Sequence, residues 1–273
     1  MLHRPAWAPD EIDIERPAPA RMYDYYLGGS HNFAADRQLA EANLQVWPDL
    51  AAICQANRGF LHRSVRYLAA QAGIGQFLDL GSGIPSIGNV HEVAGAVDPE
   101  AVTVYVDADP VAFAHGEMML RNDPHTAIIH ADLRDPQGVL SHPVVTRYMD
   151  LSQPVAVVMN SVVPFVPDED DPAAVIAAFR EATAPGSYLV LSHATSDYRP
   201  ERATRTQGIY AKASHTATFR SRAQIEAFMA GYELVEPGLV DVINWRPDPD
   251  AGPDRLGGDV TRYSLLAAVG RRD

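Results

Sequence analysis

The pattern of apolar and polar positions changes near Gly73. Between residues 20 and 73, apolar side chains recur at helical spacing, as Leu61, Val65 and Leu68 do. Paired glycines follow the stretch ARMYDYYL, and Gly73 follows the last apolar stripe, so both stretches end where a helix is expected to stop. The first part of the chain is therefore predicted to be helical.

After Gly73, short apolar runs alternate with helical stretches. Several of these helices open with Asp-Pro, at 109–110, 135–136 and 171–172, a pair suited to the N-cap and the first helical position. Strands that alternate with helices predict a parallel sheet covered on both faces. The runs predicted as strands are QFLDL (76–80), VTVYVD (102–107), TAIIHAD (126–132), PVAVVMNS (154–161) and SYLVLSHA (187–194).

The tail of the chain breaks this alternation. After the helical SRAQIEAFMAG (221–231), the runs YELVEPGLVDVINW (232–245) and RYSLLAAVGRR (262–272) have no helix between them. Parallel neighbours need a crossover connection, whereas strands joined by a loop can pair antiparallel. The sheet is therefore expected to end in an antiparallel pair.

These patterns divide the chain into three parts. Residues 1–19 carry four prolines among acidic residues and predict an extended or mobile arm. Residues 20–73 predict a helical cap, and residues 74–273 an α/β core. Within the core, the long polar insertion at 195–220 is expected to shape substrate binding.

Composition narrows the function. A net charge of −13 over 273 residues repels phosphate backbones and anionic membranes, so neither nucleic acid nor a membrane is an expected partner. No apolar run reaches membrane-spanning length and the N-terminus does not have the apolar core of a signal peptide, so a cytoplasmic protein is expected. Cys54 is the only cysteine, and the acidic DEDD (168–171) suits a helix N-terminus, so no metal site is predicted.

The stretch FLDLGSGIPS (77–86) has the form of a strand that enters a glycine turn beneath a nucleotide. The dinucleotide fingerprint G-x-G-x-x-G needs a third glycine where this chain has Ser86. Asp79 lies at the carboxyl end of the strand, where its charge would repel a pyrophosphate and suit an ammonium or sulfonium cation. S-adenosylmethionine has both cations and no phosphate, so the loop favours it over a nicotinamide dinucleotide.

Acidic residues recur where later strands end. Asp107 closes the second predicted strand and can accept hydrogen bonds from both hydroxyls of a ribose, in either cofactor. Asp132 closes the third strand and can accept from an adenine amino group, with Leu133 against the ring.

With these residues in place, the pattern DLGSG … YVDADP … ADL resembles class I S-adenosylmethionine-dependent methyltransferases. The stretches RMYDYYLGGSHNFAADR (21–37), FLDLGSGIPSIGNVHEV (77–93) and FVPDEDDPAAV (165–175) resemble one bacterial family of that class. This is the S-adenosyl methyltransferase domain family, long catalogued as of unknown function. The resemblance extends from about Ala20 to the C-terminus.

The resemblance implies an α/β, Rossmann-like fold with a seven-stranded, mostly parallel sheet whose last strand is antiparallel. A departure is Ile84-Pro85 after Gly83, which implies a stiffer turn than the glycine found nearby in many relatives. The cofactor contacts implied by the resemblance are Asp79, Gly81, Ser82, Gly83, Asp107, Ala108, Asp109, Asp132 and Leu133.

Further residues are candidates for the cofactor site. The helix before the first strand should run antiparallel to it, which places Arg58 near a methionine carboxylate; a surface ion pair is the alternative. Tyr23 and Asn32 belong to a polar block that we expect to form a lid. Asn160 and Ser161 end the fourth strand, which in this fold class faces the transferred methyl group.

The acceptor side is predicted from fewer signals. His193 ends the fifth strand and is the candidate general base for a hydroxyl or amine, with an internal hydrogen bond as the alternative. In the insertion, Tyr198, Arg199, Tyr210 and His215 are candidates to line the acceptor pocket.

The predicted function is methyl transfer from S-adenosylmethionine to a small molecule, by an in-line displacement in a shielded site. Oxygen, nitrogen and carbon acceptors all fit this pattern. The first alternative is a sensor or regulator that binds the cofactor without catalysis, because no indispensable base is visible. The second is a nicotinamide-dependent oxidoreductase, which Ser86 and Asp79 disfavour.

Overall fold

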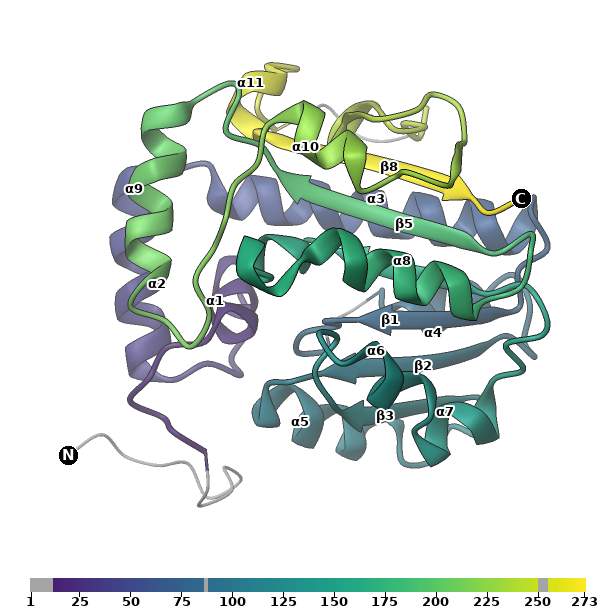
Figure 1. Cartoon of the computed structure of the whole chain (residues 1–273). Coiled ribbons are helices and arrows are strands. Elements are labelled where there is room, and N and C mark those ends of the chain that lie inside the picture. The colour runs from purple at the N-terminus through teal and green to yellow at the C-terminus, as the bar shows by residue number, and fades with distance from the viewer. Residues whose placement is uncertain (1–11, 86–87, 250–254) are drawn as a thin grey trace.

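A computed structural model describes residues 12–85, 88–249 and 255–273 of the chain. A central sheet is covered by helices on both faces, and a further group of helices stands at the end where the parallel strands finish (Figure 1). The predicted α/β architecture is confirmed.

Eight strands make up the sheet in the described part of the chain. The strands β1 to β5 run parallel in the order β3-β2-β1-β4-β5, and β8 continues the sheet antiparallel to β5. The short β6 and β7 both pair with the other side of β8. The bounds are β1 Gln76–Leu80, β2 Val102–Asp107, β3 Thr126–His130, β4 Ala156–Asn160, β5 Tyr188–Ala194, β6 Glu233–Leu234, β7 Val240–Asp241 and β8 Leu265–Arg271.

The expected seven strands correspond to β1 to β5, β8 and one interrupted segment that contains β6 and β7. Between these two pieces, Pro237 has no backbone N–H to donate, and Gly238 adopts a left-handed φ of 83°. Pairing with β8 stops there and resumes at Val240. The antiparallel end of the sheet is confirmed.

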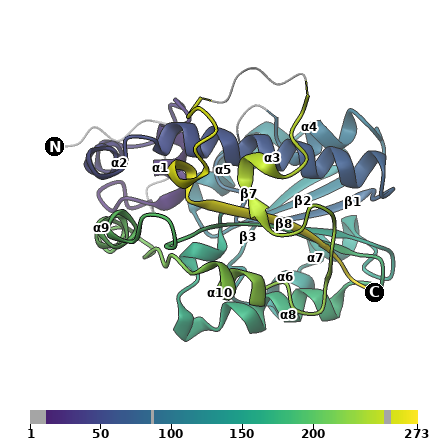
Figure 2. The same ribbon diagram turned by 90° about the horizontal axis from the view of Figure 1, so that it is seen from above.

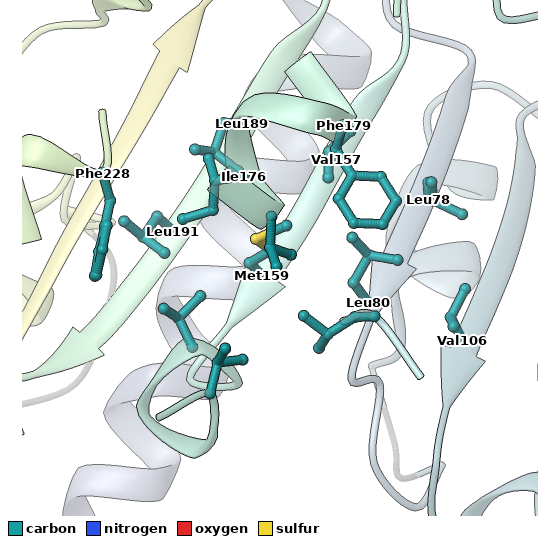
Figure 3. Packing of buried hydrophobic residues seen from close by; sticks show 14 of the residues in the cluster. Leu78, Leu80, Val106, Val157, Met159, Ile176, Phe179, Leu189, Leu191 and Phe228 are labelled. Carbon is teal, nitrogen blue, oxygen red and sulfur yellow. The ribbon is translucent and has the colours of Figure 1, made fainter. Parts of the chain in front are cut away.

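Alternation along each strand produces two apolar layers. On β1, Leu78 and Leu80 face the side of α8, where Phe179 packs against the sheet, as Figure 3 shows. Phe77 points to the opposite face, together with Val158 of β4. All of these side chains are fully buried, and each such burial contributes roughly 1.5–3 kcal/mol to folding.

The covering helices lie in two layers (Figure 2). One face carries α3 Leu50–Ala70, α4 Val90–Gly95 and α5 Pro110–Leu120. The other carries α6 Pro136–Leu140, α7 Pro143–Tyr148, α8 Pro172–Ala182 and α10 Arg222–Ala227. Short helical segments also occur in the loops: η1 Val163–Phe165, η2 Asp168–Asp170, η3 Val242–Asn244 and α11 Val260–Tyr263.

The Asp-Pro helix starts follow the prediction. The Asp109 carboxylate accepts from Val111 N at 2.8 Å and begins α5. Asp135 and Asp171 cap α6 and α8 in the same way, through Gly138 N and Ala174 N. These caps fix where each helix leaves the carboxyl end of the preceding strand or loop.

In the structure we use the word cap for α1 Pro19–Tyr26, α2 Ala34–Val46 and α9 Pro200–Tyr210, which stand beside the strand ends in Figure 1. This group differs from the helical cap expected at 20–73, because it includes α9 and leaves out α3. The helix α9 comes from the insertion at 195–220 and packs against α2. The long α3 begins at the cap and continues along the sheet, because its apolar stripe, with Phe60, Val65 and Leu68, is buried there.

The predicted N-terminal arm is described only in part, since residues 1–11 lie outside the described residues. The following segment is docked on the core. Ile12 is buried with Phe33 and Val111, and Pro17 O accepts a hydrogen bond from Ser214 N at 2.7 Å. Within the described ranges, no helix combines the length and apolarity needed to cross a membrane.

Candidate functional site

A cavity lies where the carboxyl ends of β1 to β4 meet the cap. Its lining combines strand ends with segments from α1, α3, the turn after β4 and the loop after α9. The strand-end and adjoining residues are Asp79, Gly81, Ser82, Gly83, Val106, Asp107, Ala108, Asp109, Ala131, Asp132, Leu133, Arg134, Asn160, Ser161 and Val162. The others are Ala18, Pro19, Ala20, Tyr23, Arg58, Leu61, Phe165, Val166, Tyr210, Ser214 and His215.

The turn after β1 depends on two glycines, each with a left-handed φ of 68°. Gly81 N and Ser82 N donate to Val106 O, which ties the turn to β2. A Cβ at Gly81 would lie 2.1 Å from the Val162 side chain, whereas a Cβ at Gly83 would meet only open space. Gly81 is therefore required by packing, and Gly83 leaves the backbone accessible from the cavity.

Asp107 holds this turn from the end of β2. Its carboxylate accepts from Gly83 N at 2.6 Å and from Asp109 N at 2.8 Å. Burial raises the pKa of Asp107 to about 6, although both backbone donors act in the opposite direction. Each carboxylate oxygen retains a lone pair for a further donor in the cavity.

Asp79 is the most isolated acid of the site. It is buried and lines the cavity, and its carboxylate accepts no hydrogen bond from the described residues. Burial raises its pKa to about 7; the nearby Arg58 guanidinium opposes this shift, and the Asp107 carboxylate adds to it. A cationic group placed beside Asp79 would stabilise its ionised form.

Arg58 lines the cavity from α3. The helix was expected to start near Asn57 and Arg58, but it begins at Leu50, so Arg58 lies about two turns inside it. Its guanidinium donates to Gly88 O at 2.8 Å and to Asn89 Oδ1 at 3.4 Å. The Arg58 charge also acts on Asp79, where it opposes the rise in the pKa of that carboxyl group.

Asp132 and Leu133 follow β3 and line the cavity. Arg134 donates to both oxygens of Asp132, with the closest contact at 2.6 Å, and its other amino group donates to Asp170 at 2.8 Å. The Asp132 carboxylate is therefore held in a fixed orientation, and its pKa is lowered by the hydrogen bonds from Arg134 even though burial acts the other way.

Beneath the cavity, polar side chains connect the strand ends to the cap. Ser192 Oγ lies 2.7 Å from Asn57 Oδ1, 3.0 Å from Asn160 Oδ1 and 3.2 Å from Ser161 Oγ. Asn57 Nδ2 donates to the Tyr23 hydroxyl at 3.1 Å. Ser161 adopts a left-handed φ of 59°, an uncommon conformation for a residue other than glycine.

Most predicted cofactor residues therefore meet in one cavity. Asn32 is the exception: it is buried beside the cap, where its amide donates to Asp24 Oδ2 at 2.8 Å and to Gly29 O. Of the predicted acceptor residues, Tyr210 and His215 line the cavity. Tyr198 and Arg199 do not, and Arg199 instead donates to Thr261.

His193 does not reach the cavity, and its placement does not support a catalytic role. Its Nδ1 donates to Ala194 O at 2.8 Å and its Nε2 accepts from Arg220 Nη1 at 3.0 Å. Burial lowers the pKa of His193 to about 3, and the Arg220 charge contributes to that shift. The structure therefore shows the alternative, in which His193 forms internal hydrogen bonds.

No sequence pattern predicted that the other residues would line the cavity. Ala18, Pro19 and Ala20 line the cavity at the start of α1, and we call these three residues the roof. The hydrogen bond from Ser214 N to Pro17 O joins the roof to the loop after α9. Phe165 lies in the turn η1 and contacts Tyr210 with ring centroids 5.4 Å apart. In the described residues, no group of three or more His, Cys, Asp or Glu side chains is arranged to hold a metal ion.

Two solved structures are similar to this chain over nearly its whole length. A candidate methyltransferase from Thermobifida fusca YX is 40% identical with a TM-score of 0.90, and the match covers 98% of this chain and 100% of that one. A DUF574 family protein from Streptomyces avermitilis MA-4680 is 38% identical with a TM-score of 0.91, and the match covers 96% and 99%.

A more distant structure shares the fold alone. Human N-acetylserotonin methyltransferase, solved in complex with SAM, is 11% identical with a TM-score of 0.50 over 92% of this chain and 70% of that one. A comparison with curated proteins gives no match. The S-adenosyl methyltransferase family matches residues 5–273, in agreement with the resemblance inferred from the sequence. The chain therefore belongs to the S-adenosyl methyltransferase family.

Proposed function

We propose that the chain is an S-adenosylmethionine-dependent methyltransferase that acts on a small molecule, with its cofactor held in the cavity at the strand ends. Membership of the family supports methyl transfer in general. The proposed position of the cofactor rests on Asp79. Its buried carboxylate lines the cavity and has no hydrogen-bond donor among the described residues. An ammonium group of a ligand supplies the partner that such a buried acid requires.

The residues present fit the groups of S-adenosylmethionine. Asp79 suits the ammonium group and Arg58 the carboxylate of the methionine part. Asp107 suits the ribose hydroxyls, and Leu133 with the fixed Asp132 carboxylate suits the adenine. Ser82 Oγ is buried at the cavity and has no hydrogen-bond partner in the described part of the chain, so it is available to a ligand.

The same cavity fits a nicotinamide dinucleotide poorly. Carboxylates of Asp79, Asp107 and Asp109 all line the cavity near the glycine turn. A pyrophosphate there would lie beside these carboxylates in a partly buried site, where little solvent screens the repulsion between the negative charges.

Catalysis in this site depends on alignment. The cofactor, when bound, supplies a methyl group activated by the positive charge on sulfur. The chain's residues orient it, and the roof of Ala18, Pro19 and Ala20 restricts water. The Tyr23 hydroxyl donates to Cys54 O at 3.0 Å, and burial raises its pKa well above the usual range, so Tyr23 is not a base at neutral pH.

Calorimetry tests the proposal, with S-adenosylmethionine, its demethylated product and NADH titrated separately into the protein. We expect the first two to bind, NADH not to bind, and Asp79→Ala and Asp107→Ala to weaken binding at least tenfold. Glu117→Ala, on the exposed side of α5, is the matched control and should bind as wild type does. Binding of NADH, or unchanged binding by both cavity variants, would overturn the assignment.

A second assay separates an enzyme from a sensor. Methyl-labelled S-adenosylmethionine is incubated with the protein and a small-molecule extract. Label that appears in small molecules with wild type but not with Asp79→Ala supports transfer. Cofactor binding without transfer from any extract would instead support a sensor.

A further inference from the structure

Charge divides the cavity into two parts. Its charged lining residues, Asp79, Asp107, Asp109, Asp132, Arg58 and Arg134, lie at or against the ends of β1, β2 and β3. These are the positions that the proposed function assigns to the cofactor. Asn160 and Ser161, at the end of β4, mark the boundary of this charged half.

Two polar lining residues, Ser214 and His215, come from the loop after α9, and His215 interacts electrostatically with Asp132 and Arg134 of the charged half. The lining residues that follow Ser161, and those that α1, α3 and α9 contribute beyond Arg58, are apolar or aromatic. We call this part the acceptor wall and define it by Tyr23, Leu61, Val162, Phe165, Val166 and Tyr210. No residue of the wall carries a charge at neutral pH. Val162, Phe165 and Val166 follow β4, Tyr210 ends α9, and Tyr23 and Leu61 come from α1 and α3.

The two phenols of the wall direct their hydroxyl groups away from the cavity. The Tyr23 hydroxyl donates to Cys54 O and accepts from Asn57 Nδ2. The Tyr210 hydroxyl interacts with Tyr26 and Asn43 inside the cap. Both residues therefore offer ring surface to the cavity, and their hydrogen-bonding groups serve the cap.

The turn after β4, which carries Val162, Phe165 and Val166, is held by a buried arginine. Arg220 is 2% exposed and donates to Val163 O at 3.2 Å, Val166 O at 2.8 Å and the Asp168 carboxylate. Its charge is neutralised there and does not line the cavity. The position of Phe165 is thus set by a buried network rather than left to a free loop.

We propose that the methyl acceptor is an uncharged aromatic small molecule whose ring lies against Phe165 and Tyr210. This inference rests on the proposed function, which assigns the charged half of the cavity to the cofactor. An apolar wall without free polar groups favours a ring and disfavours an acceptor with a carboxylate or ammonium, because a buried charge there would find no partner.

The chemical step balances with this acceptor. A lone pair of the acceptor heteroatom forms a bond to the methyl carbon while the bond from carbon to sulfur breaks and its electron pair stays on sulfur. The cofactor leaves as a neutral thioether. A proton on the acceptor heteroatom is released to solvent.

The test uses the protein loaded with the demethylated cofactor, so that binding is measured without turnover. Three probes share one ring system: 2-naphthol, 2-naphthoate and 2-naphthylmethylammonium, neutral, anionic and cationic at pH 7.5. We expect 2-naphthol to bind at least tenfold more tightly than either charged probe. Phe165→Ala should weaken its binding about tenfold.

Controls separate this inference from the function on which it rests. Phe113→Ala removes a ring on α5 that stacks on His130 outside the cavity and should not change probe binding. If the demethylated cofactor binds but 2-naphthol does not, or a charged probe binds better, or Phe165→Ala has no effect, the acceptor class is wrong while the methyltransferase assignment stands. If the demethylated cofactor itself does not bind, both fail.

Discussion

Arg21 on α1 lies 3.5 Å from the Asp109 carboxylate at the cavity rim, and its Nε lies 3.0 Å from Asp36 of α2. Asp36 in turn accepts from Ala18 N at 2.9 Å and from Phe33 N at 2.7 Å. Arg21 is 3% exposed and Asp36 is fully buried. One buried cation therefore joins the cap, the cavity roof and the turn between β2 and α5.

Replacing Arg21 should affect both stability and binding. Arg21→Ala leaves the Asp36 carboxylate buried without its cation, which costs about 3–5 kcal/mol of unfolding free energy. It also removes the cation that orients the Asp36 carboxylate, which holds Ala18 N, so the demethylated cofactor should bind more weakly. Urea unfolding and calorimetry measure the two effects.

Arg66→Ala is the matched control for this prediction. Arg66 forms an exposed ion pair with Asp248 at 3.8 Å. Exposed pairs contribute roughly 0–1 kcal/mol, so this variant should resemble wild type in both assays. Equal losses in the two arginine variants would show that the buried network has no special role.

The buried acids should make stability depend on pH. Burial raises the pKa of Asp79 to about 7 and that of Asp107 to about 6, whereas an aspartate in an unfolded chain has a pKa of about 3.9. Between these values the folded protein holds protons that the unfolded chain has released. The contribution of these groups to the unfolding free energy is therefore complete below about pH 4 and is lost as the pH rises to about 7.

Asp79→Asn should remove part of this dependence. Relative to wild type, its unfolding free energy should increase as the pH rises from 5 to 7, by at most about 1.4 kcal/mol per pH unit. Urea unfolding of the ligand-free protein at several pH values gives this difference directly. A constant difference between the two proteins would mean that Asp79 is already ionised at pH 5.

Two glycines of the turn after β1 should respond differently to alanine. Gly81→Ala adds a Cβ that lies 2.1 Å from Val162 in a left-handed conformation, which costs about 2–5 kcal/mol from strain and overpacking together. Gly83→Ala has the same φ but an open surrounding, so only about 1–2 kcal/mol is lost.

Ligand affinity should show the opposite order: among folded variants, the loss of affinity should be larger in Gly83→Ala than in Gly81→Ala. The Cβ in Gly83→Ala projects into space that the proposed ligand needs, so a well-folded variant should bind the demethylated cofactor at least tenfold more weakly. Thermal unfolding identifies which variant is folded, and calorimetry on that variant gives the affinity. Unchanged affinity in Gly83→Ala would place the ligand elsewhere in the cavity.

The acidic residues that line the cavity could be predicted from the sequence, because their position follows from the apolar runs and from one rule of sheet topology. Asp79, Asp107 and Asp132 each end an apolar run, and the ends of parallel strands meet at one edge of the sheet. The glycine turn between β1 and α4 marked that edge in the sequence. The hydrogen bonds that fix Asp132 to Arg134 and Asp107 to Gly83 N required the structure.

The other side of the cavity depends on contacts between distant segments. The roof forms because Ser214 N meets Pro17 O, and the acceptor wall forms because Phe165 meets Tyr210. Neither pair has a spacing that a sequence pattern reveals. His193 was placed at a strand end, yet β5 continues to Ala194 and His193 pairs with Leu266 inside the sheet.

His193 should remain neutral across the physiological range. Its Nδ1–H donates to Ala194 O and its Nε2 accepts from Arg220, while burial lowers its pKa to about 3. Nuclear magnetic resonance of the imidazole should therefore show one unchanging neutral tautomer, with the proton on Nδ1, between pH 5 and 8. Arg220→Gln should move the pKa upward, because it removes a nearby positive charge, although burial keeps it below 6.5. A midpoint near 6.5 in the wild-type protein would return His193 to the list of possible bases, since only an imidazole that titrates near neutrality can exchange a proton with an acceptor there.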